Sequence, residues 1–101
     1  MDFTNAVFAS DGLEGCDVAE ARYNRGLSNY HLELWRDAIN DFSKAIDSDP
    51  NRFEFFEMRA ESYLRRSDFD AAESDFEEAL EISGAARFNE KIKLCRQNAN
   101  R

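Results

Sequence analysis

The chain has 101 residues, of which 43% are hydrophobic and 13% aromatic, enough to build one small folded domain. Its formal net charge of −8 argues against the basic face that phosphate binding requires, so we expect neither a nucleic acid nor an anionic membrane as partner. No apolar run approaches the ~20 residues of a membrane span, and the start lacks the basic region of a signal peptide, so we expect a soluble, cytoplasmic protein.

The chain begins with residues 1–18, which contain the turn-rich stretch DGLEG and are expected to be flexible. A sharper hypothesis is that Phe3, Val7 and Phe8 fold back, or reach a second molecule, and cover apolar surface. Regular structure is predicted for the rest of the chain.

Residues 19–52 and 53–86 are two copies of one unit, because a shift of 34 residues superposes them. The matches fall at positions where side-chain size matters. Small residues recur at Gly26/Ala60, Ala38/Ala72 and Ala45/Ala79, and aromatic residues recur at Trp35/Phe69 and Phe42/Phe76. Two charged positions recur as well, and their repetition predicts an ion pair between the two helices of each unit. These positions are Arg25/Arg59 and Asp41/Asp75.

Each unit is predicted to form two helices, because apolar residues recur at the 3.6-residue period in two successive stretches. In the first unit, Asp17 with Glu20 is expected to cap the first helix. Pro50 is expected to end the second helix, because the residue before a proline avoids the α region. The small residues Gly26 and Ala38 should let these two helices approach closely.

In the second unit, Asn51 with Glu54 is expected to cap the first helix, and Gly84 stands where a glycine cap ends the second. A fifth helix over about 85–98 is expected to cover the last repeat, because a terminal repeat needs a polar outer face. The expected organisation is an N-terminal segment 1–18, repeats 19–52 and 53–86, and a capping helix with tail 87–101.

These features resemble the tetratricopeptide repeat (TPR) family, whose pattern asks for small residues and aromatics in the slots found here. Pro50 also matches the proline of that pattern. The departures are Arg22 for a large apolar residue, Asn29 for an aromatic one, and Glu33 and Ser67 for the usual turn glycine. The resemblance implies an all-α fold with two TPR helix-turn-helix repeats and a C-terminal capping helix, stacked as a short right-handed α-solenoid.

The resemblance further implies a non-catalytic module that binds a short segment of a partner protein in a concave groove, lined by the first helix of each repeat. The implied groove residues are Glu20, Tyr23, Asn24, Leu27, Tyr30, His31, Glu54, Glu57, Met58, Glu61, Leu64 and Arg65, with Lys91 and Cys95 from the last helix. The tyrosines and the methionine suit apolar or cationic ligand groups. The row of glutamates favours a basic or amphipathic segment, although such a row is also typical of a solvated helix face.

One TPR subclass, the chaperone-binding domains, holds a C-terminal carboxylate with Lys, Asn and Arg side chains. The corresponding positions here carry Tyr23, Leu27, Met58, Phe88 and Ile92. None of these side chains is a cationic donor, so the carboxylate clamp is the less favoured interpretation.

Charge supports an alternative function of a different class. Residues 53–86 hold ten acids and three bases, whereas residues 87–101 hold one acid and five bases. The acidic second repeat of one copy could therefore meet the basic last helix of another, as in a self-associating structural unit or homo-oligomer.

No pattern in the sequence predicts catalysis, a metal site or a cofactor. His31 is the single histidine and has no nucleophile at a readable spacing. The stretch DSDPNRFEFFEM resembles a calcium loop only superficially, since Arg52 stands where that loop needs glycine and Met58 where it needs glutamate. Cys16 and Cys95 fit no metal or redox spacing. We therefore expect a protein or peptide partner and no small-molecule substrate.

Overall fold

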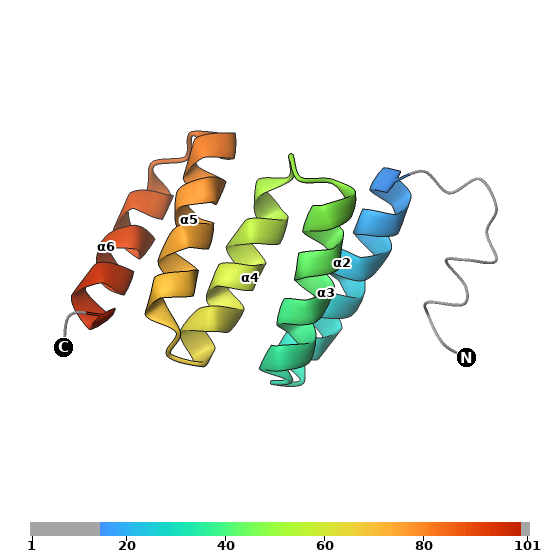
Figure 1. Ribbon diagram of the computed structural model, residues 1–101, viewed down its shortest axis with the longest axis horizontal. Helices are drawn as coiled ribbons and strands as arrows, with labels where there is room; N and C mark the ends of the chain where they lie inside the picture. Colours follow the sequence, from blue (N-terminus) through green and yellow to red (C-terminus); the bar gives the residue numbers. More distant parts are fainter. Residues whose placement is uncertain (1–14, 100–101) are drawn as a thin grey trace.

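The computed structural model describes residues 15–99, which form five helices joined by short turns (Figure 1). The helices are α2 (Gly15–His31), α3 (Trp35–Ser48), α4 (Phe53–Arg65), α5 (Phe69–Ser83) and α6 (Arg87–Ala99). This part of the chain is all-α, as the sequence predicts. The hypothesis on Phe3, Val7 and Phe8 concerns residues that lie outside the described range.

The helices stand in one row from α2 to α6, and their chain direction alternates along the row (Figure 1). Each helix packs against the next one in sequence, and α2 also touches α4. The helices α2, α4 and α6 therefore run the same way. This is the arrangement of a helical repeat solenoid, in which each helix pair needs its neighbours to bury its apolar side.

The core follows the alternation of small and aromatic residues along the repeats. A Cβ atom placed on Gly26 would lie 2.6 Å from the ring of Phe42, so α2 and α3 approach as closely as predicted. Ala45 packs with Phe55 of the next repeat, which confirms its predicted role between units. The aromatic Phe42 and Phe76, one per repeat, are fully buried. Close contact at the small residues leaves these rings no space to move.

The two helix–helix turns within the repeats share an unusual backbone geometry. Glu33 has a φ of 62° and Ser67 a φ of 61°, in the left-handed region where the family pattern has glycine. A side chain in this region costs about 1–2 kcal/mol. Gly84, which adopts the same conformation with a φ of 71°, ends α5 as predicted.

We expect the substitution Ser67→Gly to raise the free energy of unfolding by about 0.5–1 kcal/mol. Glycine relieves the strain of the left-handed turn, although part of the gain is offset by its greater freedom in the unfolded chain. Thermal melting followed by circular dichroism should show a midpoint about 4 °C higher. Ser74→Gly, at an exposed position inside α5, serves as the control and should lower the midpoint. A lower midpoint for Ser67→Gly as well would contradict the strain argument.

Two of the predicted helix caps are wrong. α2 begins at Gly15, so Asp17 lies inside the helix and not at its N-cap. The N-cap of α4 is Arg52, one residue after the expected Asn51, and no side chain caps it. Asn51 lies in the turn that follows α3, and its backbone N–H donates a hydrogen bond to the Asp49 side chain at 3.4 Å.

Candidate functional site

The helices α2, α4 and α6 are tied together by a row of polar and aromatic contacts, and we call this surface the α2–α4–α6 face. α4 is tied to α2 at both ends and to α6 along its middle. The contacts are Tyr23–Phe55 (ring centroids 4.9 Å apart), Arg52–Glu20 (3.2 Å), Arg65–Tyr30 (3.4 Å), Arg87–Glu57 (2.6 Å) and Lys91–Glu61 (3.0 Å). The face therefore contains residues from both repeats and from the capping helix.

The α2 residues predicted for the groove differ in how accessible they are. Tyr23 is half-buried, and its ring packs against Phe42 of α3 and Phe55 of α4, so it fills space between these helices. Burial raises the pKa of its hydroxyl, and the nearby glutamates of α4 raise it further. Leu27 is half-buried, whereas Asn24 and His31 are exposed.

The glutamate row of α4 is neutralised within the chain. Glu57 accepts two hydrogen bonds from Arg87, at 2.6 and 3.2 Å, and Glu61 pairs with Lys91 at 3.0 Å. Glu54 pairs with Arg52 at 3.4 Å. The row is therefore not a bare solvated face, because bases from α6 and from the start of α4 cover it.

A cavity of about 260 Å³ lies at the end of the face where α2 turns into α3. It is lined by Tyr30, His31, Glu33, Trp35 and Arg65. Three of these residues were predicted for the groove. Glu33 and Trp35 were missed, because the family pattern assigns groove residues to the first helix of each repeat and these two lie in the turn and in α3. The aromatic identity of Trp35, which lies five residues after Tyr30, is the signal that could have found it.

Cys95 does not lie in the groove, in contrast to the prediction. It is fully buried, and burial raises the pKa of its thiol to about 11, with Glu73 and Glu61 adding to the rise. The reason is the pattern of α6, in which Phe88, Ile92 and Cys95 share the side packed against the second repeat. Only the polar side of α6 contributes to the face.

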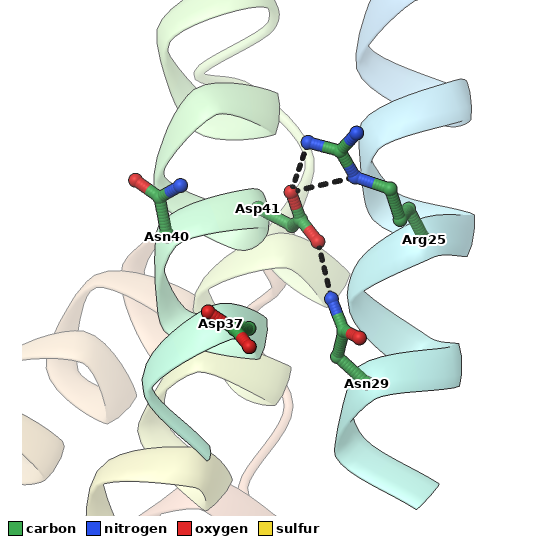
Figure 2. Close-up of a pocket in the computed structure, with 5 residues that line it drawn as sticks. All are labelled: Arg25, Asn29, Asp37, Asn40 and Asp41. Carbon is green, nitrogen blue, oxygen red and sulfur yellow. Dashed lines mark hydrogen bonds and ion pairs between the residues drawn. The ribbon is translucent and has the colours of Figure 1, made fainter. Parts of the chain in front are cut away.

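The predicted ion pair between the two helices of each unit is present in both repeats. Arg25 donates to Asp41 at 2.7 Å, and Arg59 donates to Asp75 at 2.7 and 2.8 Å. In the first repeat Asn29 also donates to Asp41, at 2.8 Å, and Figure 2 shows Arg25 and Asn29 pointing from α2 toward this carboxylate. Asn29 therefore replaces the family's usual aromatic with a hydrogen-bond donor. Because both aspartates are at most 5% exposed, we assign these pairs a structural role.

The pair of the second repeat also links the two repeats. Arg59 donates a further hydrogen bond, at 2.9 Å, to the Ser43 hydroxyl on α3. Next to the first pair, a shallow polar cavity of about 180 Å³ opens between α2 and α3 and includes Asp37 and Asn40 of α3 (Figure 2). Across residues 15–99 no group of His, Cys, Asp or Glu side chains is placed to hold a metal ion. No helix in that range has the length and apolar character to cross a membrane.

Comparison with known proteins agrees with this architecture. A sequence model described as "Tetratricopeptide repeat" matches residues 23–87, which is more than half of the chain. The protein "Tetratricopeptide repeat protein 16" from Homo sapiens and that from Macaca fascicularis are each 33% identical to this chain over 60 residues. That match covers 59% of this chain and only 7% of either relative, so the chain spans a small part of their length.

A solved structure, "Arabidopsis OM64 TPR domain", has the same fold. It superposes with a TM-score of 0.80 over 84% of this chain and 71% of that domain, at 21% sequence identity. The chain belongs to the tetratricopeptide repeat family. The repeats of this family generally mediate protein–protein interaction, and their fold is typically a non-catalytic scaffold.

Proposed function

We propose that this chain is a non-catalytic interaction module that binds a short basic or amphipathic segment of a partner protein on the α2–α4–α6 face. The observation that carries the proposal is the pairing of Glu57 and Glu61 with exposed bases. Each glutamate side chain is 21% exposed, whereas the side chains of Arg87 and Lys91 are 57% and 42% exposed. The carboxylates are thus less exposed than the cations of α6 that cover them.

A partner base can compete with these cations, because the cations face solvent. Ion pairs between solvent-exposed groups contribute about 0–1 kcal/mol, so displacing Arg87 or Lys91 costs the chain little, and a single partner base gains little in their place. Leu27 and Met58, which are half-buried, offer adaptable apolar surface nearby. An amphipathic segment with bases along one edge fits both features.

The same ion pairs weaken the alternative of self-association. That hypothesis needs the bases of α6 to reach the acidic second repeat of another copy. In the structure three of the four bases of α6 already pair with the second repeat of their own chain. The pairs are Arg87–Glu57, Lys91–Glu61, Arg96–Glu73 and Arg96–Glu77. We therefore favour a separate partner protein.

The double substitution Glu57→Gln/Glu61→Gln should weaken the binding of a basic amphipathic peptide about fivefold to tenfold. Each lost carboxylate removes one exposed ion pair with the peptide, and the pairs contribute modestly. Fluorescence anisotropy with a labelled peptide measures the affinity at low and high salt. The difference between wild type and variant should shrink at high salt, because exposed pairs are screened.

A matched control removes the same charge elsewhere. Glu78→Gln/Glu81→Gln changes two exposed glutamates of α5, so the net charge of the two variants is identical. Equal losses of affinity in both variants would mean that only net charge matters and would contradict the proposed site. Absence of peptide binding, together with a sedimentation mass that rises with concentration, would favour self-association instead.

A further inference from the structure

Four arginines in residues 15–99 lie over aromatic rings, and three of them also pair with a carboxylate. Their guanidinium carbons lie 4.4–5.8 Å from the nearest ring centroids. The paired ones are Arg52 with Glu20 and Glu54, Arg59 with Asp75, and Arg87 with Glu57. Arg65 is the exception, because no carboxylate of the described residues lies within 4.0 Å of it. Three of these four arginines thus combine an aromatic ring with a carboxylate partner, and Arg65 has the rings alone.

Arg65 is oriented by its neighbours but keeps donors to spare. Its guanidinium lies 5.6 Å from the Trp35 ring and 5.9 Å from the Tyr30 ring. Its single hydrogen bond in the described chain is a long one, from Nε to the Tyr30 hydroxyl at 3.4 Å. A guanidinium offers several further N–H groups in a planar fork that suits a carboxylate. The two rings hold this fork at the cavity at the end of the face.

The turn that borders this cavity carries two exposed leucines, which are not among the residues that line it. Leu32 is 68% exposed and Leu34 is 45% exposed, and both lie in the turn beside Glu33. They are two of the three large hydrophobic residues that the described chain leaves exposed. Apolar residues next to a ligand carboxylate on Arg65 would find exposed leucines in the adjoining turn.

We propose that the Tyr30–Trp35–Arg65 cavity takes an acidic side chain, flanked by apolar residues, from the same partner segment whose bases bind Glu57 and Glu61. The inference rests on the proposed function and specifies the order of basic and acidic residues along the bound segment. Glu57, Glu61 and Arg65 follow one another at intervals of four residues along α4, so the span from the first to the last is about 12 Å. An extended segment covers that span in about four residues. Its acid therefore lies about four residues from one base and two from the other.

Glu33 opposes a ligand carboxylate, because it lines the same cavity. The pKa of Arg65 is raised mainly by its hydrogen bond to Tyr30, and the charge of Glu33 adds a smaller contribution. Its exposed side chain forms no ion pair with Arg65. In the absence of a partner it keeps a negative charge near the guanidinium. The substitution Glu33→Gln should therefore tighten the binding of an acid-bearing segment a few-fold.

The test uses two peptides blocked at both termini, so that no terminal carboxylate contributes. Both carry the same two bases and the same leucines, and they differ by Glu or Gln at the position four residues from the first base. Each peptide is also made with its sequence reversed, so that both directions of binding along α4 are tested. We expect one Glu peptide to bind the wild-type chain about fivefold more tightly than its Gln counterpart, as measured by fluorescence anisotropy.

The variant Arg65→Gln should abolish this preference, whereas Arg66→Gln, which removes the same charge from the next exposed residue, should keep it. Equal binding of the Glu and Gln peptides to the wild-type chain would overturn the inference and leave the proposed function intact. A Glu preference that survives Arg65→Gln would also overturn it. Failure of all four peptides to bind would overturn the proposed function together with the inference.

Discussion

Replacing Phe76 with alanine should lower the free energy of unfolding by about 3–5 kcal/mol. The ring is fully buried, and its centroid lies 6.1 Å from that of Phe88 on α6. It belongs to the apolar cluster in which α4, α5 and α6 meet, together with Ala60 and Ile92. Loss of the ring leaves a cavity that the helices cannot close without breaking the close contacts at the small residues.

Urea denaturation followed by circular dichroism measures this loss as a shift in midpoint at nearly constant slope. Since small domains have total stabilities of about 5–15 kcal/mol, this loss is a large fraction of the total. Leu94→Ala is the control, because Leu94 is 44% exposed and truncating it should cost less than 1 kcal/mol. A loss below 1 kcal/mol for Phe76→Ala would show that the repeat interface is not the main source of stability.

The substitution Arg59→Met should lower the free energy of unfolding by about 3 kcal/mol at neutral pH. It leaves the carboxylate of Asp75 buried without its cation, which costs more than the pair contributes when intact. The Asp75 side chain is 7% exposed, and both of its oxygens accept hydrogen bonds from Arg59. Ser43 on α3 loses its donor as well.

The destabilisation by Arg59→Met should shrink as pH falls. Burial raises the pKa of the Asp75 carboxyl, and the Arg59 hydrogen bonds oppose that rise, so the pKa rises further in the variant. A carboxyl whose pKa is higher in the folded than in the unfolded chain binds its proton more tightly when folded. Proton binding by the Asp75 carboxyl therefore stabilises the folded chain fully at pH values below the pKa of the unfolded chain, near 3.8. This stabilisation is lost as the pH rises through the pKa of the folded chain. Denaturation of wild type and variant over a pH series measures the difference.

Two further variants separate the pair from its surroundings. Arg59→Met/Asp75→Leu replaces both charges with apolar groups and should recover most of the lost stability. Arg36→Met removes an exposed arginine of α3 and should change stability by less than about 0.5 kcal/mol. If the double variant were as unstable as Arg59→Met, the cost would come from lost packing of the arginine and not from the uncompensated carboxylate.

The charges of the α2–α4–α6 face have a consequence for any partner of this chain. Arg87 and Lys91 cover the acids of α4, so a basic segment at the proposed site would compete with cations of the chain itself. Tethered groups act at high effective concentration, which keeps the affinity for a single base low. A segment that also makes apolar contacts, or places an acid on Arg65 as proposed, should gain affinity that its bases alone do not supply.

The sequence alone determined the repeat, the helix pairs and the internal ion pairs. A position at which two helices pack closely tolerates only a small residue, so the small residues at Gly26 and the equivalent positions identify the fold in each repeat. Arg25 and Arg59, with their aspartates, recur for the same reason, because one geometry is built twice. Local chemistry also places the glycine cap of α5 at Gly84.

The tertiary structure decided which of the predicted groove residues share a surface and which charges are already used. The buried position of Cys95 and the pairing of Glu57 with Arg87 depend on how α6 rotates against the second repeat, and helical period alone leaves that rotation open. The cavity around Arg65 joins α4 to a turn and to α3, which lie about thirty residues earlier in the chain. Contacts over such separations arise from the packing of whole helices, so no local pattern of residues encodes them.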